Sequence, residues 1–290
     1  MKHANAIRKA AAALLCATSL LTLLTGCSQE QPAPPIPSPS YSEPTPSPAP
    51  ADTPSPAPTP APTPSPTPEP TPTPAPVPAT GSTAAAVGAS LPMTVPESAP
   101  VDDSYFADAV FVGDSRTEGL RMYSGLTGAK FFSEVGLTVT KAFSDSFVAL
   151  DGQYLTAAEA LRQADYGKVY IMLGMNELGW VYESVFADEY GKIIDVIRES
   201  HPGAEIYVQS IIPVSRWKDG SNDIYTNANV VRLQKALAEM CVEKGVHYVN
   251  VAEAVQDADG FLPADATPDG LHLTPEYCKI WLDYLRTHTA

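Results

Sequence analysis

Positively charged residues are scarce in this sequence. The chain has 18 Lys and Arg residues against 33 Asp and Glu residues, over 290 positions. A protein with this excess of negative charge is repelled by phosphate backbones and by anionic lipid head groups. The composition therefore argues against nucleic acid as a partner.

Long apolar runs are also missing, with one exception near the amino terminus. Ala10 to Leu24 is apolar and follows three basic residues and no acidic one. The run is too short for a comfortable membrane span and is typical of a secretory signal peptide, here residues 1–26. Without this segment, 15 basic residues face 33 acidic ones, a net charge of −18.

The signal peptide ends in Leu24-Thr25-Gly26-Cys27, which resembles the bacterial lipobox. In that motif, cleavage before the cysteine leaves a lipid-modified amino terminus. We therefore expect an extracytoplasmic protein that is anchored to the bacterial cell membrane by acyl chains on Cys27. The alternative is an ordinary signal peptide followed by an incidental cysteine.

Cysteine is nearly absent from the rest of the chain. Cys16 would leave with the signal peptide and Cys27 would carry the lipid, so only Cys241 and Cys278 remain. Both lie in predicted helices. We expect two buried free thiols, and a disulfide between them is the alternative.

Proline is concentrated in one segment that lacks any apolar periodicity. Of the 30 prolines, 22 lie between residues 31 and 80. Repeats of Pro with Ala, Thr and Ser favour polyproline II, which rises about 3 Å per residue, so we interpret residues 27–100 as the lipidated cysteine and a disordered, semi-stiff linker. A ligand for a proline-binding module is the alternative. Residues 101–290 are then enough for one globular domain.

The globular segment alternates between two patterns. Apolar runs rich in strand-forming residues recur five times, and amphipathic helical stretches separate most of them. This alternation predicts an α/β fold in which helices cover both faces of a parallel sheet. Helix starts are expected at Thr156 with Glu159, at Ser184, and at Thr274 with Pro275. The predicted strands are 109–113, 129–135, 168–173, 205–212 and 246–251.

The first strand ends abruptly in Gly113-Asp114-Ser115, and a helix follows. This turn places Ser115 at the carboxyl end of a strand and beside the free N–H groups of a helix start. A nucleophile needs such exposure, and an oxyanion needs such donors. The alternative is that Asp114 or Ser115 only caps the helix.

Two later turns carry side chains of matching chemistry. The strand at 168–173 ends in a turn with Asn176, whose amide can donate to an oxygen that develops negative charge, unless it only makes the turn. Asp269-Gly270-Leu271-His272 precedes the last helix. Its spacing lets Asp269 hold the ring of His272 while the ring takes a proton from a hydroxyl.

These blocks, in this order, resemble those of the SGNH or GDSL-type hydrolases over residues 101–290. The resemblance implies that Ser115 is the nucleophile and that Asp269 and His272 complete a catalytic triad. It implies an oxyanion hole formed by Ser115, Gly136 and Asn176. It also implies a flavodoxin-like three-layer α/β/α sandwich with five parallel strands, and neither metal nor organic cofactor.

Two residues depart from the family pattern. Arg116 stands where leucine is usual, and Glu177 stands where aspartate is usual. Arg116 is expected either to line the site and contact anionic or polyhydroxylated substrates, or to be a surface arginine in the first helical turn.

The resulting functional hypothesis is a serine esterase or acylhydrolase that removes short acyl groups, above all acetyl, from envelope carbohydrate. Polar and aromatic residues in the loops suit sugar rings, if these loops border the site. The alternatives are an O-acyltransferase that uses the same residues and a glycan-binding lipoprotein without turnover. The loop residues are Trp180, Tyr182, Arg216 and Trp217.

Overall fold

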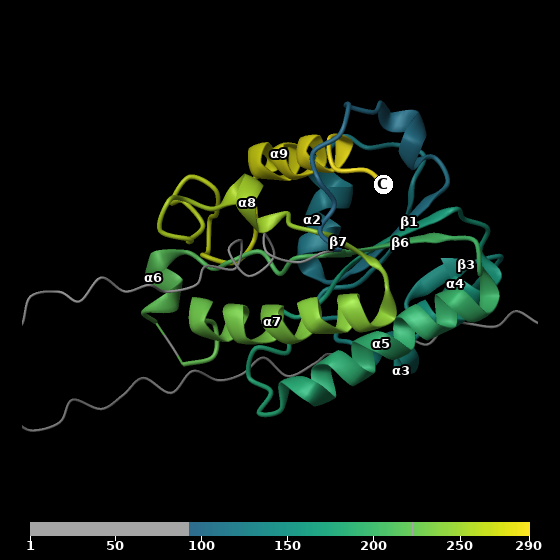
Figure 1. Ribbon diagram of the computed structural model, residues 1–290, viewed down its shortest axis with the longest axis horizontal. Helices are drawn as coiled ribbons and strands as arrows, with labels where there is room; N and C mark the ends of the chain where they lie inside the picture. Colours follow the sequence, from purple (N-terminus) through teal and green to yellow (C-terminus); the bar gives the residue numbers. More distant parts are fainter. Residues whose placement is uncertain (1–92, 222) are drawn as a thin grey trace, which may run out of the picture. The chain divides into compact units, whose positions relative to one another are not determined.

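The structure is a computed structural model, and it describes residues 93–221 and 223–290 (Figure 1). The predicted signal peptide, the lipid attachment at Cys27 and most of the proline-rich linker lie outside the described residues. Among the residues that are described, no helix combines the length and the apolar character that a bilayer span requires.

A five-stranded parallel sheet forms the centre of the described part, with strand order β2-β1-β5-β6-β7. All five strands were predicted, although four of them are shorter than the apolar runs that indicated them. A short antiparallel hairpin, β3 with β4, was not predicted, because strands of three residues are too short to show a two-residue period. The strands are β1 Ala109–Gly113, β2 Lys130–Ser133, β3 Val148–Leu150, β4 Gln153–Leu155, β5 Lys168–Met172, β6 Glu205–Gln209 and β7 His247–Val249.

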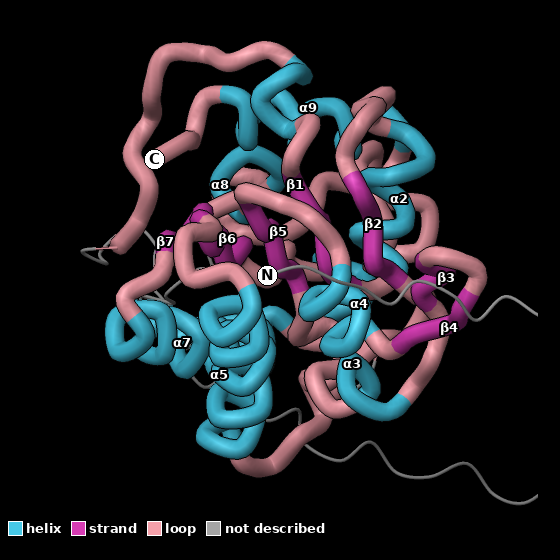
Figure 2. Tube along the Cα trace, turned by 90° about the vertical axis from the view of Figure 1, so that its right-hand side faces the viewer, coloured by secondary structure: helices cyan, strands magenta, loops and turns pink. Residues whose placement is uncertain are grey.

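Helices cover both faces of the sheet, as Figure 2 shows. One layer contains α2, α8 and α9, and the other contains α4, α5 and α7. The predicted three-layer α/β/α sandwich is therefore confirmed. The helices are η1 Asp103–Phe106, α2 Ser115–Tyr123, α3 Lys141–Ser144, α4 Ala157–Gln163, α5 Glu183–Ser200, α6 Arg216–Asp219, α7 Asn227–Lys244, α8 Ala252–Val255 and α9 Pro275–Arg286.

Alternation along the strands divides the apolar core into two parts. In β1, Val110 and Val112 pack under α4, α5 and α7, whereas Phe111 packs under α2 and α9. Every residue of β1 is buried. A strand of this kind has an apolar side chain on each face, which explains why the runs in the sequence are continuous rather than alternating.

A row of rings crosses the sheet and fixes the strand register. Phe131, Phe111, Tyr170, Tyr207 and His247 occupy successive strands, and each ring stacks on the next at centroid distances of 4.5 to 5.0 Å. Each neighbouring pair is also a direct partner in the strand pairing. Cross-strand aromatic pairs stabilise one register, so this row aligns the carboxyl ends of the strands, where the candidate site lies.

The helix starts agree with the sequence in two of three cases. Thr156 and Glu159 form a full capping box, and Thr274 with Pro275 opens α9. The start expected at Ser184 is wrong by one residue: α5 begins at Glu183, and the side chain of Tyr182 before it makes no capping hydrogen bond. A sequence that lacks a capping side chain gives no local signal for where the helix begins.

Residues 93–100, which the sequence assigned to the linker, include several that hydrogen-bond to the globular domain. Residues from Met93 onward pair with β7: Val95 N–H donates to Tyr248 O at 2.8 Å, and Tyr248 N–H donates to Met93 O at 2.9 Å. Ser98 N–H donates to Thr287 O at 2.6 Å. These contacts are long-range, so the local composition of residues 93–100 could not reveal them.

Cys241 and Cys278 are free and buried, as expected, and the disulfide alternative is wrong. Burial raises the pKa of both thiols, because an apolar surrounding disfavours the thiolate. We therefore assign both cysteines to packing.

Candidate active site

The turn after β1 is built by a glycine and an aspartate. A Cβ on Gly113 would lie 2.0 Å from Thr117 Oγ1 and 2.6 Å from Met172 O, so only glycine lets α2 approach the strand this closely. Asp114 caps α2, and its Oδ1 accepts from Arg116 N–H at 2.9 Å. Since Asp114 caps the helix, the hydroxyl of Ser115 is not needed as the cap and remains available to interact with other side chains.

Ser115, His272 and Asp269 form one hydrogen-bonded row. Ser115 Oγ lies 2.9 Å from His272 Nε2, and His272 Nδ1 lies 2.6 Å from Asp269 Oδ2. Ser115 is part-buried, and the side chains of His272 and Asp269 are 45% and 48% exposed. A ring between a hydroxyl and a carboxylate can accept the hydroxyl proton, while the carboxylate stabilises the charged ring. The structure thus brings together the three residues that the sequence named.

Asp269 is held as a carboxylate. Desolvation acts to raise its pKa, but hydrogen bonds outweigh it and lower the pKa to about 2. The donors are the N–H and ring of His272 and the N–H of Leu271. Asp269 therefore stays charged at every pH at which the protein would be assayed for activity.

Gly270 shapes the loop that carries the histidine. Its φ of +85° is one that side chains rarely adopt, and a Cβ there would lie 2.7 Å from Ser215 Oγ and 3.0 Å from Trp217 Cζ2. Ser215 N–H also donates to Gly270 O at 3.0 Å. The segment at the start of α6 is therefore packed directly against the loop of His272.

The side-chain amide of Asn176 contacts two turns of the site. Asn176 Nδ2 donates to Leu137 O at 2.9 Å and makes a long contact of 3.4 Å with Asp114 Oδ2. Asn176 thus joins the turn after β2, which contains Gly136, to the turn that presents Ser115. All three residues assigned to the oxyanion hole lie on turns that these hydrogen bonds connect.

Glu177 is a further residue of the site whose role the sequence did not reveal. It is fully buried, and its Oε1 accepts from Val139 N–H at 2.7 Å. Its Oε2 has no hydrogen-bond partner among the described residues. Glu177 therefore anchors the loop after β2 through its buried hydrogen bond with Val139. The glutamate directly after Asn176, where aspartate is usual in the family, was the available signal, but the sequence could not say what that residue contacts.

Burial raises the pKa of Glu177 to about 8, and the nearby carboxylate of Asp114 adds to this effect. Between about 4.5 and 8 the folded protein keeps a proton that the unfolded chain releases, so the free energy of unfolding should fall as pH rises through this window. Glu177→Gln cannot ionise and keeps an acceptor for Val139. Its melting temperature should match the parent at pH 5 and exceed it increasingly toward pH 8.

Thermal melts at half-unit pH steps measure this difference. Glu243→Gln, a change at an exposed glutamate, is the matched control and should follow the parent throughout. A constant difference between Glu177→Gln and the parent at all pH values would contradict a protonated Glu177.

Arg116 occupies neither of its expected places. Only 3% of it is exposed, so it is not a surface arginine. Its guanidinium does not point into an open site either, because its N–H groups donate to the carbonyl groups of Leu271, Ile212 and Pro213. The sequence placed Arg116 in the first helical turn correctly, but the loops that enclose it come from distant parts of the chain.

The four loop residues named from the sequence differ in position. Trp217 is 54% exposed and lies beside Gly270, so it borders the histidine loop. Arg216 forms an ion pair with Asp259 at 2.6 Å and is also exposed. Tyr182 is 69% exposed and precedes α5, whereas Trp180 packs partly against the core.

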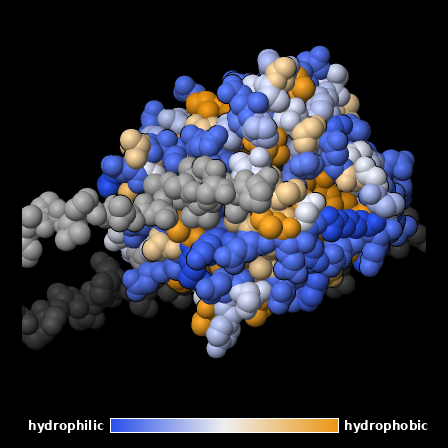
Figure 3. All heavy atoms as spheres, viewed as in Figure 1, coloured by the Kyte–Doolittle hydropathy of each residue, from blue (hydrophilic) through white to orange (hydrophobic). Residues whose placement is uncertain are grey.

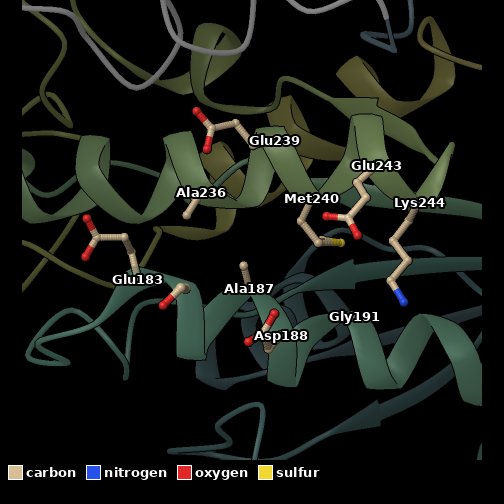
Figure 4. Close-up of a pocket in the computed structure, with 10 residues that line it drawn as sticks. Glu183, Ala187, Asp188, Gly191, Ala236, Glu239, Met240, Glu243 and Lys244 are labelled. Carbon is tan, nitrogen blue, oxygen red and sulfur yellow. The ribbon is translucent and has the colours of Figure 1, made fainter.

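A groove of about 350 Å³ lies between α5 and α7 (Figure 4). Carboxylates from both helices line it, and no residue of the triad does.

Within the described ranges, no cluster of three or more His, Cys, Asp or Glu side chains is arranged to hold a metal ion. The face seen in Figure 3 is mainly hydrophilic, with apolar side chains in small separate groups.

The fold and the site together define a class of protein. It is an α/β protein in which a serine at the carboxyl edge of the parallel sheet is hydrogen-bonded to a histidine. A model of the GDSL-like lipase/acylhydrolase family matches residues 111–279, more than half of the chain. The chain belongs to this family, also called SGNH hydrolases, and the family resemblance seen in the sequence is confirmed. A search of curated proteins gave no match.

Solved structures share the fold. A candidate platelet activating factor from Streptococcus pneumonia is 21% identical, with a TM-score of 0.51, over 63% of this chain and 89% of its own. A candidate acylhydrolase from Bacteroides fragilis is 16% identical, with a TM-score of 0.46, over 69% and 89%. A GDSL-like lipase from Bacteroides thetaiotaomicron is 17% identical, with a TM-score of 0.45, over 69% and 90%.

Proposed function

We propose that this protein is a serine esterase that hydrolyses short acyl esters through Ser115, His272 and Asp269. The observation that carries the proposal is the 2.9 Å contact between Ser115 Oγ and His272 Nε2, in line with the 2.6 Å contact to Asp269. This arrangement serves nucleophilic catalysis and has no evident use in binding alone.

In the proposed reaction, Ser115 Oγ forms a bond to the ester carbonyl carbon while its proton passes to His272 Nε2. The carbonyl oxygen becomes an oxyanion, held by the N–H groups of Ser115 and Gly136 and by the amide hydrogen of Asn176 that makes only a long contact to Asp114. The C–O bond to the alcohol then breaks, and the alcohol takes the proton from His272. Water then attacks the carbonyl carbon of the acyl-enzyme while His272 takes its proton. The bond to Ser115 Oγ breaks, Ser115 Oγ takes the proton from His272, and the acid is released.

We further propose an extracytoplasmic location, a lipid anchor at Cys27 and a carbohydrate substrate that carries acetyl or another short acyl group. The signal sequence, the lipobox and the long proline-rich segment support a target that lies outside the membrane but within reach of it. Trp217 supports a sugar, because an exposed aromatic face beside the histidine loop suits the apolar face of a sugar ring. The net negative charge argues against anionic phospholipid as substrate.

The test offers the purified full-length protein nitrophenyl acetate, nitrophenyl palmitate, acetylated glycan fragments and phospholipid vesicles. We expect kcat/KM for the acetate to exceed that for the palmitate at least tenfold, and free acetate to appear from the glycan. Faster hydrolysis of the long-chain esters would overturn the substrate class and leave the catalytic residues standing. Transfer of acetyl to an added glycan hydroxyl, in place of free acetate, would identify an acyltransferase.

Matched variants separate glycan binding from chemistry in the same assay. Trp217→Ala should raise KM for the glycan several-fold and leave kcat/KM for nitrophenyl acetate nearly unchanged. Tyr154→Ala removes another exposed ring, 74% accessible on the β3–β4 hairpin, and should change neither. An equal KM for the glycan in Trp217→Ala and parent would remove Trp217 from the proposed sugar contacts.

A further inference from the structure

Arg116 is a buried cation beside the nucleophile. It is the second residue of α2, directly after Ser115, and it forms no ion pair with any described carboxylate within 4.0 Å. Burial lowers its pKa to about 10, against the attraction of Asp114 and Asp269, so it remains charged at neutral pH. Charged groups are costly to bury, and an apolar side chain would avoid that cost.

The partners of Arg116 are backbone carbonyls from two loops. Its Nε donates to Leu271 O at 2.9 Å, and its terminal nitrogens donate to Ile212 O and to Pro213 O, the latter at 3.2 Å. The planar guanidinium can bind several acceptors at fixed angles, which a lysine cannot do. Arg116 therefore ties the helix of the nucleophile to the loop after β6 and to the loop of the histidine.

One peptide group is held from both sides. The carbonyl of Leu271 and the N–H of His272 belong to the same planar peptide unit. Arg116 binds the carbonyl oxygen at 2.9 Å, and Asp269 Oδ1 accepts from the N–H at 2.8 Å. The orientation of this unit sets where the side chain of His272 leaves the backbone, and hence whether its ring reaches Ser115 Oγ.

We propose that Arg116 is a positioning residue that fixes the His272 ring against Ser115 by holding the Leu271–His272 peptide. This inference rests on the proposed function. The side chain of Arg116 donates hydrogen bonds to backbone carbonyls and to neither Ser115 Oγ nor the imidazole, so it acts through the backbone. Misplacement of a catalytic group by about 1 Å can lower the rate about a hundredfold, so losing one side of this support is expected to reduce turnover far more than substrate binding.

The test uses the full chain with Arg116→Met, which keeps an unbranched apolar stem but removes every donor. Activity on nitrophenyl acetate is measured at a temperature at which circular dichroism shows the variant folded. We expect kcat to fall about 10- to 100-fold and KM to change less than twofold. The proton resonance between His272 Nδ1 and Asp269, which the short contact places at low field, should shift or broaden.

Two further variants serve as a second test and as a control for lost stability. Arg116→Lys keeps the charge but cannot reach both loops, and should lower kcat at least fivefold even if Arg116→Met does not fold. Gln209→Leu, which removes the acceptor of Trp281 Nε1 at 2.8 Å deep in the fold, is the matched control for lost stability and should keep the parent kcat. Parent-like kcat in folded Arg116→Lys or Arg116→Met would overturn the proposal.

The failure of this proposal is distinguishable from failure of the proposed function. A parent protein that hydrolyses no ester would remove the esterase, but the low-field resonance would still report whether Arg116→Met displaces His272. An active parent with an unchanged resonance and unchanged kcat in both Arg116 variants would remove only the role of Arg116.

Discussion

Ser115→Ala should lower kcat for nitrophenyl acetate by about four orders of magnitude or more and leave the fold intact. Without the hydroxyl, no acyl-enzyme forms, and only the oxyanion donors and substrate binding remain to accelerate attack by water. The side chain is small and part-buried, so its removal leaves no large cavity. The kinetic constants and a thermal melt measure both halves of this expectation.

Covalent labelling gives a second measurement that does not depend on the choice of ester. A fluorophosphonate should modify one serine in the parent and none in Ser115→Ala. Ser144→Ala is the control, since Ser144 is exposed and bonds only its neighbour Asp145. Turnover at the parent rate in folded Ser115→Ala would end the proposed mechanism.

The same reasoning predicts that losses at the site are not additive. His272→Ala leaves Ser115 without a base and should cost about as much as Ser115→Ala. The double variant should then be no slower than either single one. A further large loss in the double variant would show that the two side chains act independently, which the 2.9 Å contact between them argues against.

The sequence predicted those parts of the site that local chemistry determines. Ser115 lies just after a strand-ending glycine, and Asp269 and His272 share one short loop, so each of these two blocks could be recognised locally. The contact between Ser115 and His272 joins distant segments and was implied by the family resemblance. The five strands could be predicted for the same reason, because each is a continuous apolar run in a sheet covered on both sides.

The parts that the sequence did not predict depend on contacts between distant segments. Arg116 and Glu177 were recognised as departures from the family pattern, but their burial depends on the loops after β6 and β2. Nothing near Arg116 in the chain indicates that Leu271 and Pro213 will accept its hydrogen bonds. Met93 likewise joins the domain only by pairing with β7, far along the chain.

Both departures from the family pattern support the catalytic loops from within. Glu177 holds the loop that contains Gly136, and Arg116 holds the loop that contains His272. In each case a long side chain satisfies backbone groups that would otherwise be buried without partners. These two departures therefore concern the support of the site more than its chemistry.

Asp269→Asn should retain the fold and lower kcat by about four orders of magnitude. The amide has no charge to stabilise the imidazolium, and its NH₂ group can favour the wrong tautomer of His272. Because the pKa of Asp269 is about 2, ionisation of Asp269 should contribute no limb to the activity of the parent between pH 4 and pH 9. A pH–rate profile from pH 4 to 9 measures this directly.

Stability provides an independent check on the charge of Asp269. A lowered pKa in the folded state contributes stability above the unfolded value, and this contribution is lost as pH falls through about 2. The parent should therefore lose its stability advantage over Asp269→Asn between pH 4 and pH 2.

Asp265→Asn, a change at an exposed residue of the preceding segment, is the control for the rate measurement and should keep the parent kcat. If Asp269→Asn turns over like the parent at pH 7, another group orients His272, and the 2.6 Å contact has no catalytic role.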